Sequence, residues 1–228
     1  MAQKVERPVF GSKDFVHLHL HTDYSLLQST IQLKPLAKRL KELDMRACAI
    51  TDYGNMYGAV SYFNVMSGNG IQPIIGIEAH LTFGSRLDRT SSVGAGERGY
   101  YNIILLARDV EGYQNLIHLS SSAFTEGFHH KPRIDIELLS QRSKGLIGLS
   151  AGIDGAVSHF LLTGNEEKAL SNAKLFEDIF GKGNYYLEIQ DRVDERGQKL
   201  IADTVALSKQ SGIELVATND VHYMNADD

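Results

Sequence analysis

The sequence is poor in cysteine. Cys48 is the only one among 228 residues, and it lies within the short apolar run ACAI. A disulfide within the chain is therefore excluded, and a lone thiol in an apolar run is typical of a buried core residue. Because proteins of a reducing cytosol lack disulfide frameworks, we expect a cytoplasmic location.

Long hydrophobic runs are also missing. No stretch approaches the roughly 20 consecutive apolar residues of a membrane-spanning helix, so we expect no membrane partner. The first residues, MAQKVERPVFGSKD, lack the apolar core of a secretory signal. We therefore predict an N-terminal segment at residues 1–14 and one domain over residues 15–228. The final YMNADD follows a motif without a capped helix, so we expect the sequence to be part of a longer protein.

An excess of positive charge is absent as well. The 23 Lys and Arg residues are outnumbered by 28 Asp and Glu residues, and the net charge is -5. A domain that gripped duplex DNA by itself would be basic, because neutralising phosphates dominates such binding. We therefore expect any nucleic acid to be held by another part of a larger protein or at a local metal site.

The hydrophobic pattern predicts an α/β fold with one core. Apolar runs typical of strands occur at residues 15–21, 47–50, 73–77, 102–107, 146–150, 185–190 and 215–218. Helical patterns occur at residues 33–43, 57–66, 111–124, 166–179 and 195–210. This alternation predicts parallel βαβ units, and no phosphate-binding glycine motif follows the first strand to indicate a dinucleotide fold. About seven strands favour a closed or nearly closed (βα)7 barrel of the TIM type over an open sheet.

Histidines crowd the first predicted strand. In HLHLHTDYS, residues 17–25, His17, His19 and His21 alternate with apolar residues and would share one face of the strand. Buried, hydrogen-bonded histidines are one interpretation. Three neighbouring imidazoles at the functional end of a barrel strand favour the other, a metal site, since neutral imidazole is the commonest protein metal ligand.

Two further strand ends carry potential ligands. Glu78 closes the apolar run in PIIGIEAH, where a carboxylate must be solvated, paired or bound to a cation. Asp220 and His222 in ATNDVHY again have a spacing of two. Because the first and last strands of a barrel are neighbours, these groups could converge with the first-strand histidines. Such nitrogen and oxygen ligands suit zinc, manganese or iron.

Asp52, in TDYGN at the end of the second predicted strand, allows three interpretations. It could bind the metal directly, accept a hydrogen bond that orients a ligand histidine, or form a turn before Gly54. We rank the last two above direct ligation. His17 and Asp52 are thus expected to support the ligands.

Six motifs together resemble the PHP (polymerase and histidinol phosphatase) domain of bacterial DNA polymerase III alpha subunits. They are HLHLHTDYS, AITDYGNMYGAV, IIGIEAHL, LLARDVEGYQNL, AFTEGFHHKPRID and VATNDVHY, and the resemblance covers residues 15–223. EGYQNL and GFHHKPRID are similar to the polymerase branch and not to stand-alone histidinol phosphatases. The resemblance implies a distorted (βα)7 barrel that holds up to three metals and hydrolyses phosphoesters, including as a 3′–5′ exonuclease. It also implies a domain that braces the polymerase and that has lost its metals in some lineages.

The resemblance further implies roles for single residues. Matching ligands are His19, His21, Glu78, Asp220 and His222, and the first four form one metal site that would be catalytic. Four ligand positions depart from the family pattern, with Gln28, Tyr53, Asn102 and Gly152 in place of the usual ligands. The other two metal sites of the family need these positions. We therefore expect at most one well-bound divalent metal, or none.

Three functions follow as hypotheses. The favoured one is a structural domain of a replicative polymerase with weak or absent hydrolysis. Its expected partners are the remainder of the alpha subunit, DNA through the full-length protein, and a proofreading exonuclease subunit. The alternative is an active metal-dependent exonuclease or phosphoesterase, which the replaced ligands disfavour. A stand-alone small-molecule phosphatase is the third, and the polymerase-like motifs argue against it.

Overall fold

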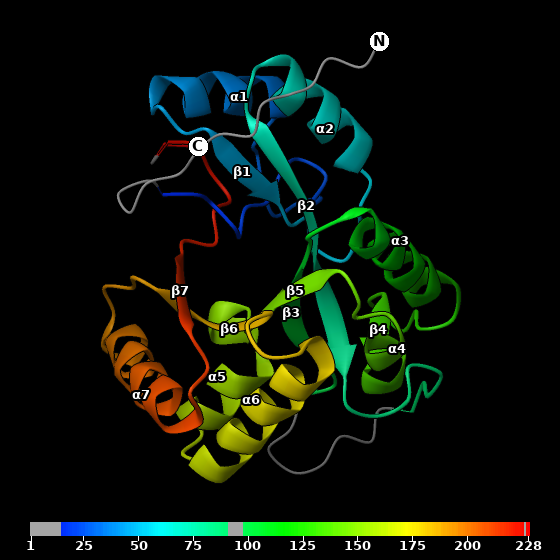
Figure 1. Ribbon diagram of the computed structural model, residues 1–228, viewed down its shortest axis with the longest axis vertical. Coiled ribbons are helices and arrows are strands. Elements are labelled where there is room, and N and C mark those ends of the chain that lie inside the picture. Colours follow the sequence, from blue (N-terminus) through cyan, green and yellow to red (C-terminus); the bar gives the residue numbers. More distant parts are fainter. Residues whose placement is uncertain (1–14, 91–97, 226) are drawn as a thin grey trace.

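The computed structural model describes residues 15–90, 98–225 and 227–228, so the predicted N-terminal segment at residues 1–14 lies outside the described residues. A seven-stranded sheet curls through the molecule, and the helices lie around its outside (Figure 1). The elements in chain order are α1 Leu33–Glu42, β1 Ala47–Ile50, α2 Ala59–Gly68, β2 Gln72–Thr82, β3 Tyr101–Ala107, α3 Val110–Thr125, β4 Arg133–Asp135, α4 Ile136–Gln141, β5 Leu146–Leu149, a 3-10 helix Gly152–Asp154, α5 Ala156–Leu162, α6 Glu166–Phe180, β6 Tyr185–Gln190, α7 Glu195–Ser211 and β7 Leu215–Thr218.

The strand order is β1-β2-β3-β5-β6-β7, with β4 pairing beside β2. Most neighbours are parallel, as the alternation of strands and helices predicted. That prediction is wrong for β3, which is antiparallel to both β2 and β5. Parallel pairing requires a crossover, usually a helix. The described part of the β2–β3 connection, residues 83–90 and 98–100, contains no helix, so β3 returns beside β2 in the opposite direction.

The segment 15–21, predicted as the first strand, forms isolated bridges at His17 and Leu20 and not a regular strand. On one side, Ala49 N donates to His17 O at 2.7 Å and Thr51 N donates to Leu20 O at 2.9 Å. On the other side, His21 N donates to Val221 O at 2.8 Å. The segment therefore lies between β1 and the residues that follow β7. This arrangement is consistent with a distorted TIM-like barrel.

The sequence did not indicate four short elements: β4, α4, the 3-10 helix and α5. Each is too short to produce a hydrophobic period that stands out from its surroundings. Local chemistry starts one of them, since the Asp135 carboxylate accepts a hydrogen bond from Leu138 N at 2.9 Å and so caps α4. The longer helices and the remaining strands lie where the pattern predicted them, within a few residues, except that β2 continues to Thr82 and so places Glu78 within the strand and not at its end.

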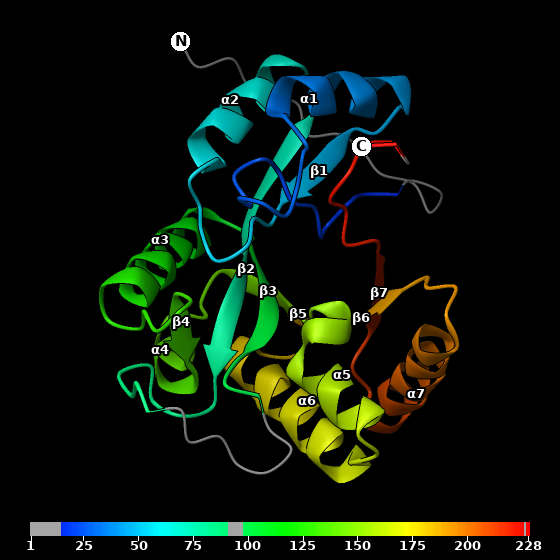
Figure 2. The ribbon, with the colours of Figure 1, turned by 180° about the vertical axis from the view of Figure 1, so that it is seen from behind.

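The helices bury one face each against the sheet. In α1, the buried residues Leu33, Leu36, Ala37 and Leu40 follow the helical period and pack near β1. Seen from behind, α1 and α2 cover the β1 end of the sheet, while α5, α6 and α7 gather at the β6–β7 end (Figure 2). Among the described residues, no helix combines the length and the apolar character that crossing a bilayer demands.

Candidate metal centre

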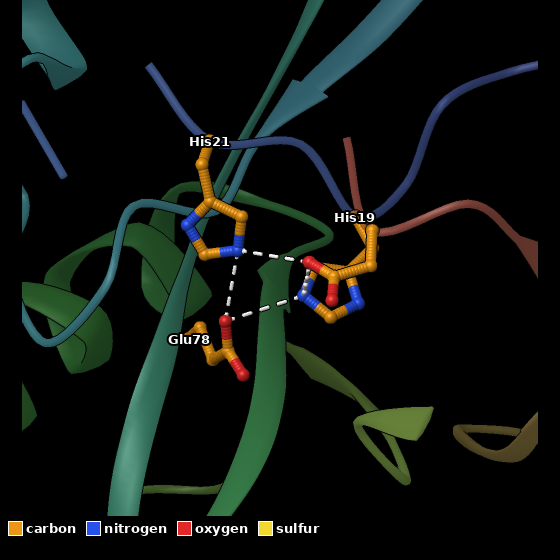
Figure 3. A group of neighbouring side chains, drawn as sticks. His19, His21 and Glu78 are labelled. Atoms are coloured by element: carbon orange, nitrogen blue, oxygen red, sulfur yellow. Dashed lines mark hydrogen bonds and ion pairs between the residues drawn. The ribbon is translucent and has the colours of Figure 1, made fainter. Parts of the chain in front are cut away.

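Four side chains from distant parts of the chain converge on one point. His19, His21, Glu78 and Asp220 each offer a ligand atom, and these atoms all lie within 4.8 Å of one another. Figure 3 shows the two imidazole rings and the Glu78 carboxylate turned toward a common centre. Three of the four side chains are buried and the fourth, Asp220, is half-buried. This cluster contains the four residues of the metal site that the family resemblance implied.

The fold supplies these residues from three places. His19 and His21 lie in the segment 17–21, and Glu78 lies in the middle of β2, where Tyr53 bridges to it. Asp220 follows β7 and is held in register by the parallel bridge between Leu20 and Val221. The backbone of Asp220 has a φ of 48°, which is uncommon for a residue with a side chain. Such backbone geometry recurs where a side chain must be aimed at a functional site.

The geometry of the cluster fits one divalent cation. Around a tetrahedral zinc ion with bonds of about 2.0–2.1 Å, neighbouring ligand atoms are about 3.3 Å apart. Here His19 Nε2 lies 3.2 Å from both Glu78 Oε2 and Asp220 Oδ1, and His21 Nε2 lies 2.9 Å and 3.4 Å from the same two oxygens. His21 Nε2 is buried and makes no hydrogen bond among the described residues. A cation would satisfy that atom.

A hydrogen-bond chain fixes the ring of His21. The Asp52 carboxylate accepts hydrogen bonds from Thr22 N, Thr22 Oγ1 and Ser25 Oγ at 2.7 to 2.8 Å. Because the Ser25 hydroxyl proton points to Asp52, Ser25 Oγ accepts from His21 Nδ1 at 3.0 Å and from Tyr53 N at 2.9 Å. Nδ1 thus carries a proton, and Nε2 is left as the atom that could bind a cation. Asp52 thus reaches His21 through Ser25 and not by a direct hydrogen bond, and its role in orienting a ligand histidine stays a prediction.

Another buried carboxylate, which the sequence analysis missed, contacts His19. Glu188 Oε1 in β6 accepts a hydrogen bond from His19 Nδ1 at 2.7 Å. The strand itself was predicted, but its YYLEIQ sequence was taken only as an apolar run. A glutamate at a buried position of a strand was the signal that could have revealed it, since an isolated buried carboxylate requires a partner.

Burial and charge act in opposite directions on the pKa values of the cluster. Burial disfavours a charged imidazole, but the carboxylates of Glu188 and Glu78 outweigh burial and raise the pKa of His19 well above 6.5. Burial would also raise the pKa of Glu78, yet the adjacent His19 and His21 hold it at about 2. The pKa of Asp220 is likewise lowered, against burial, by its contacts with His21 and His222. Without a cation, the protonated His19 imidazole therefore supplies the positive charge between the carboxylates.

These shifts predict how the stability of the cation-free protein depends on pH. The raised pKa of His19 contributes stability that is complete below 6.5 and is lost as pH rises through the folded-state pKa. The lowered pKa of Glu78 contributes stability that is complete above 4.5 and is lost as pH falls toward about 2. We expect the melting temperature to decline on the alkaline side in the presence of a chelator. Excess zinc or manganese should remove that decline, because ligand binding to the native state stabilises it. Equal melting curves with and without cation from about pH 6 to about pH 9 would contradict this expectation.

Two predicted histidines lie beside the cluster and not within it. The ring of His17 packs edge-on against Phe15 at 5.0 Å, and its Nδ1 has no hydrogen-bond partner in the described part of the chain. His222 stacks on His21 with ring centroids 4.2 Å apart, and its Nε2 lies 2.9 Å from Asp220 Oδ1. His222 Nδ1 faces the carbonyl of Gln28 at 2.9 Å. The role of His222 as a ligand stays a prediction.

Neutral groups occupy three of the four positions that depart from the family pattern, while the fourth, Gln28, is exposed. Asn102 Nδ2 donates to Glu78 Oε1 at 2.7 Å, on the oxygen that faces away from the two histidines. Tyr53 packs edge-on against His80, with ring centroids 4.4 Å apart. Gly152 has a φ of +50°, and a Cβ placed there would lie 2.6 Å from the side-chain amide of Gln190.

Comparison with known proteins agrees with this picture. The PHP domain family model matches residues 17–192. DNA polymerase III subunit alpha from Treponema pallidum is 42% identical over 94% of this chain, that from Deinococcus radiodurans is 44% identical over 95%, and that from Aquifex aeolicus is 40% identical over 95%. The chain spans only 18%, 16% and 19% of the length of these relatives, respectively.

Solved structures support the fold. A Bifidobacterium adolescentis protein, assigned by prediction as a metal-dependent phosphoesterase, superposes with a TM-score of 0.52 at 11% identity, covering 95% of this chain and 89% of that one. An amidohydrolase from Chromobacterium violaceum gives a TM-score of 0.51 at 12% identity, covering 93% and 89%. From the matched family model and the polymerase relatives, the chain belongs to the PHP domain family.

Proposed function

We propose that this chain is the N-terminal PHP domain of a bacterial replicative DNA polymerase III alpha subunit, that its role is mainly structural, and that it keeps one divalent cation site. The polymerase relatives match nearly the whole chain, whereas the chain makes up less than a fifth of each of them. We further propose that the curled sheet is the distorted (βα)7 barrel of this family, formed by residues 15–228. The cytoplasm, where bacterial replication takes place, is its proposed location.

The proposed ligands of the cation are His19, His21, Glu78 and Asp220, with His222 as a neighbour that can reach Asp220. Nitrogen and carboxylate donors of this kind suit zinc, manganese or iron. A bound cation would lower the pKa of a water ligand and make it a nucleophile toward a phosphoester. The chain's own contribution is to orient the two imidazoles and to balance the charge of the cation with two carboxylates.

One observation carries the proposal of a single site and a structural role: neutral amides adjoin Glu78 and Gly152, where the family resemblance implies ligands of a further cation. The amide of Asn102 donates a hydrogen bond to the second oxygen of Glu78, Oε1. The family's second metal site would share this oxygen. The amide of Gln190 fills the space next to Gly152, which has no side chain to offer. Neighbouring metals normally polarise the phosphate and the leaving oxygen in this chemistry. With one cation, that stabilisation is reduced.

An exposed apolar surface supports packing against the remainder of the polymerase. Five large apolar side chains are exposed along α2 and α3, namely Val60, Phe63, Val110, Ile117 and Phe124. Three of them, Val60, Phe63 and Val110, line a cavity of about 460 Å³ between these helices and β2. Contiguous exposed apolar surface marks interaction sites in soluble proteins. We propose the rest of the alpha subunit as the partner of this surface, with DNA bound through the full-length protein and a proofreading exonuclease subunit as a further partner.

An active exonuclease is the second candidate function, favoured by the completeness of the four-residue cluster. Metal analysis of protein purified without chelators and a 3′-labelled oligonucleotide assay with manganese separate the two. We expect at most one equivalent of metal and weak or absent cleavage, because leaving-group stabilisation is poor.

The control for the cleavage assay is Asp220→Asn, which removes one proposed ligand while keeping its size. Any cleavage that persists in Asp220→Asn comes from a contaminating nuclease. Two or more equivalents of metal, or rapid cleavage that Asp220→Asn abolishes, would reverse the proposal in favour of the exonuclease.

A further inference from the structure

Glu188 has a bonding pattern that its place in the strand does not require. Its Oε1 accepts hydrogen bonds from His19 Nδ1 at 2.7 Å, from Gln190 Nε2 at 3.0 Å and from the hydroxyl of Thr218. Its own backbone N donates to Ser150 Oγ at 2.8 Å. The carboxylate is thus held from its own strand, β6, and from the neighbouring strand β7. Its direction is fixed before any cation binds.

A carboxylate in this position is costly unless it has a function or strong pairing. Glu188 is 2% exposed, and its second oxygen, Oε2, has no hydrogen-bond partner in the described part of the chain. Burying a charged group without full pairing costs free energy. Among the described residues, the cationic group that it contacts is the His19 imidazole. The backbone pairing of β6 with its neighbouring strands does not require a carboxylate at this position.

The contact also decides which atom His19 presents to the cluster. With Nδ1 bonded to Glu188, the opposite ring nitrogen, Nε2, faces Glu78 and Asp220 at 3.2 Å. Histidine ligands of metals commonly donate their other N–H to a carboxylate, which sets the ring orientation and makes the ligand nitrogen a better donor. His21 has equivalent support from Ser25 and Asp52. Each ligand histidine therefore has its own hydrogen-bond acceptor at Nδ1.

We propose that Glu188 is a positioning residue of the metal centre: it holds the His19 ring with Nε2 toward the cation and strengthens that nitrogen as a ligand. This inference rests on the proposed cation site and adds a residue outside the ligand set implied by the family resemblance. Glu188 itself does not bind the cation, because its contact runs to the far side of the imidazole ring.

The test measures cation affinity and the state of the His19 ring in the 228-residue chain. Manganese and zinc affinities are measured by calorimetry for the wild type, Glu188→Ala and Glu188→Gln. We expect Glu188→Ala to weaken binding by about 10–100-fold, the usual effect of removing a carboxylate behind a ligand histidine. Glu188→Gln should recover part of this loss, since an amide oxygen can still accept from Nδ1. In the metal-free protein, the ¹⁵N resonance of His19 Nδ1 should shift in Glu188→Ala.

Asp135→Asn is the matched control. Asp135 is also a buried carboxylate, 3% exposed, but it pairs with Arg86 away from the cluster. It should leave both cation affinity and the His19 resonances unchanged. Wild-type affinity in Glu188→Ala, or an unshifted Nδ1 resonance in that variant, would overturn the role of Glu188. A wild type that binds no cation would refute the metal site itself, and the resonances of metal-free His19 would then decide separately whether Glu188 orients the ring.

Discussion

Replacing Glu78 with glutamine is expected to abolish tight cation binding and to destabilise the cation-free protein. Glu78 contacts both ligand histidines through Oε2 and Asn102 through Oε1. The substitution removes one of two negative charges that would balance a cation and leaves Asp220 to face both imidazoles by itself within the four-residue cluster. We expect affinity to fall by more than about 100-fold, the upper end for groups that act only behind a ligand. Calorimetric titration with zinc or manganese measures this change.

The same substitution breaks a buried ion pair. Glu78 is 4% exposed and its pKa is held at about 2, so it is charged throughout the stable range of the protein. Removing one partner of a buried pair costs about 3–5 kcal/mol of unfolding free energy. Urea unfolding in the presence of a chelator measures that loss.

Glu177→Gln is the control for Glu78→Gln. Glu177 also forms an ion pair, with Lys174 at 2.7 Å, but it lies on α6 outside the cluster. This pair is partly exposed, so its loss should cost about 1 kcal/mol or less. It should not change cation affinity. If Glu78→Gln binds zinc and manganese as the wild type does, the four-residue cluster is not the cation site.

Placing a cysteine at position 152, where the family usually carries a ligand, is expected to destabilise the protein without adding a second cation. Gly152 has a φ of +50°, and a new Cβ would lie 2.6 Å from the Gln190 amide. A side chain in the left-handed region costs about 1–2 kcal/mol. Overpacking against Gln190 adds about 1–3 kcal/mol. The unfolding free energy and the metal content of Gly152→Cys measure the two parts of this prediction.

A matched substitution separates the backbone cost from the steric cost. Gly164 has a φ of +73°, with no atom within 4 Å of a Cβ placed there. Gly164→Cys should therefore show only the backbone cost of about 1–2 kcal/mol. Adding Gln190→Ala to Gly152→Cys should recover the steric part, and adding Asn102→His should then permit a second equivalent of metal. A second cation in Gly152→Cys alone would contradict the proposed exclusion by Gln190.

Much of the centre could be predicted from local sequence. The spacing of His19 and His21, and the carboxylate that ends the apolar run at Glu78, follow from period-two patterns and from the cost of burying charge. Asp220 was predicted in the same way. These residues do form the cluster. His17 lies outside the four-residue cluster and packs against Phe15, and its expected supporting role stays a prediction.

The antiparallel β3 was beyond the reach of pattern analysis. An apolar run of seven residues, such as Tyr101–Ala107, is compatible with either direction. The direction is decided by the connection that precedes it and by which strands have free edges. Short elements such as β4 and α4 were not predicted from the sequence, because three to six residues do not complete enough hydrophobic periods to be recognised.

By itself, the sequence determined which residue types could bind a cation, whereas the expected place of Glu78 at a strand end was wrong, because β2 continues to Thr82. Only the tertiary structure decided which of them meet, because meeting depends on pairing between segments some 200 residues apart, such as Leu20 with Val221. The tertiary structure also decided which side chains support the ligand residues from outside the cluster. Glu188 behind His19 and Gln190 beside Gly152 contact these residues across the sheet, where no spacing along the chain links them.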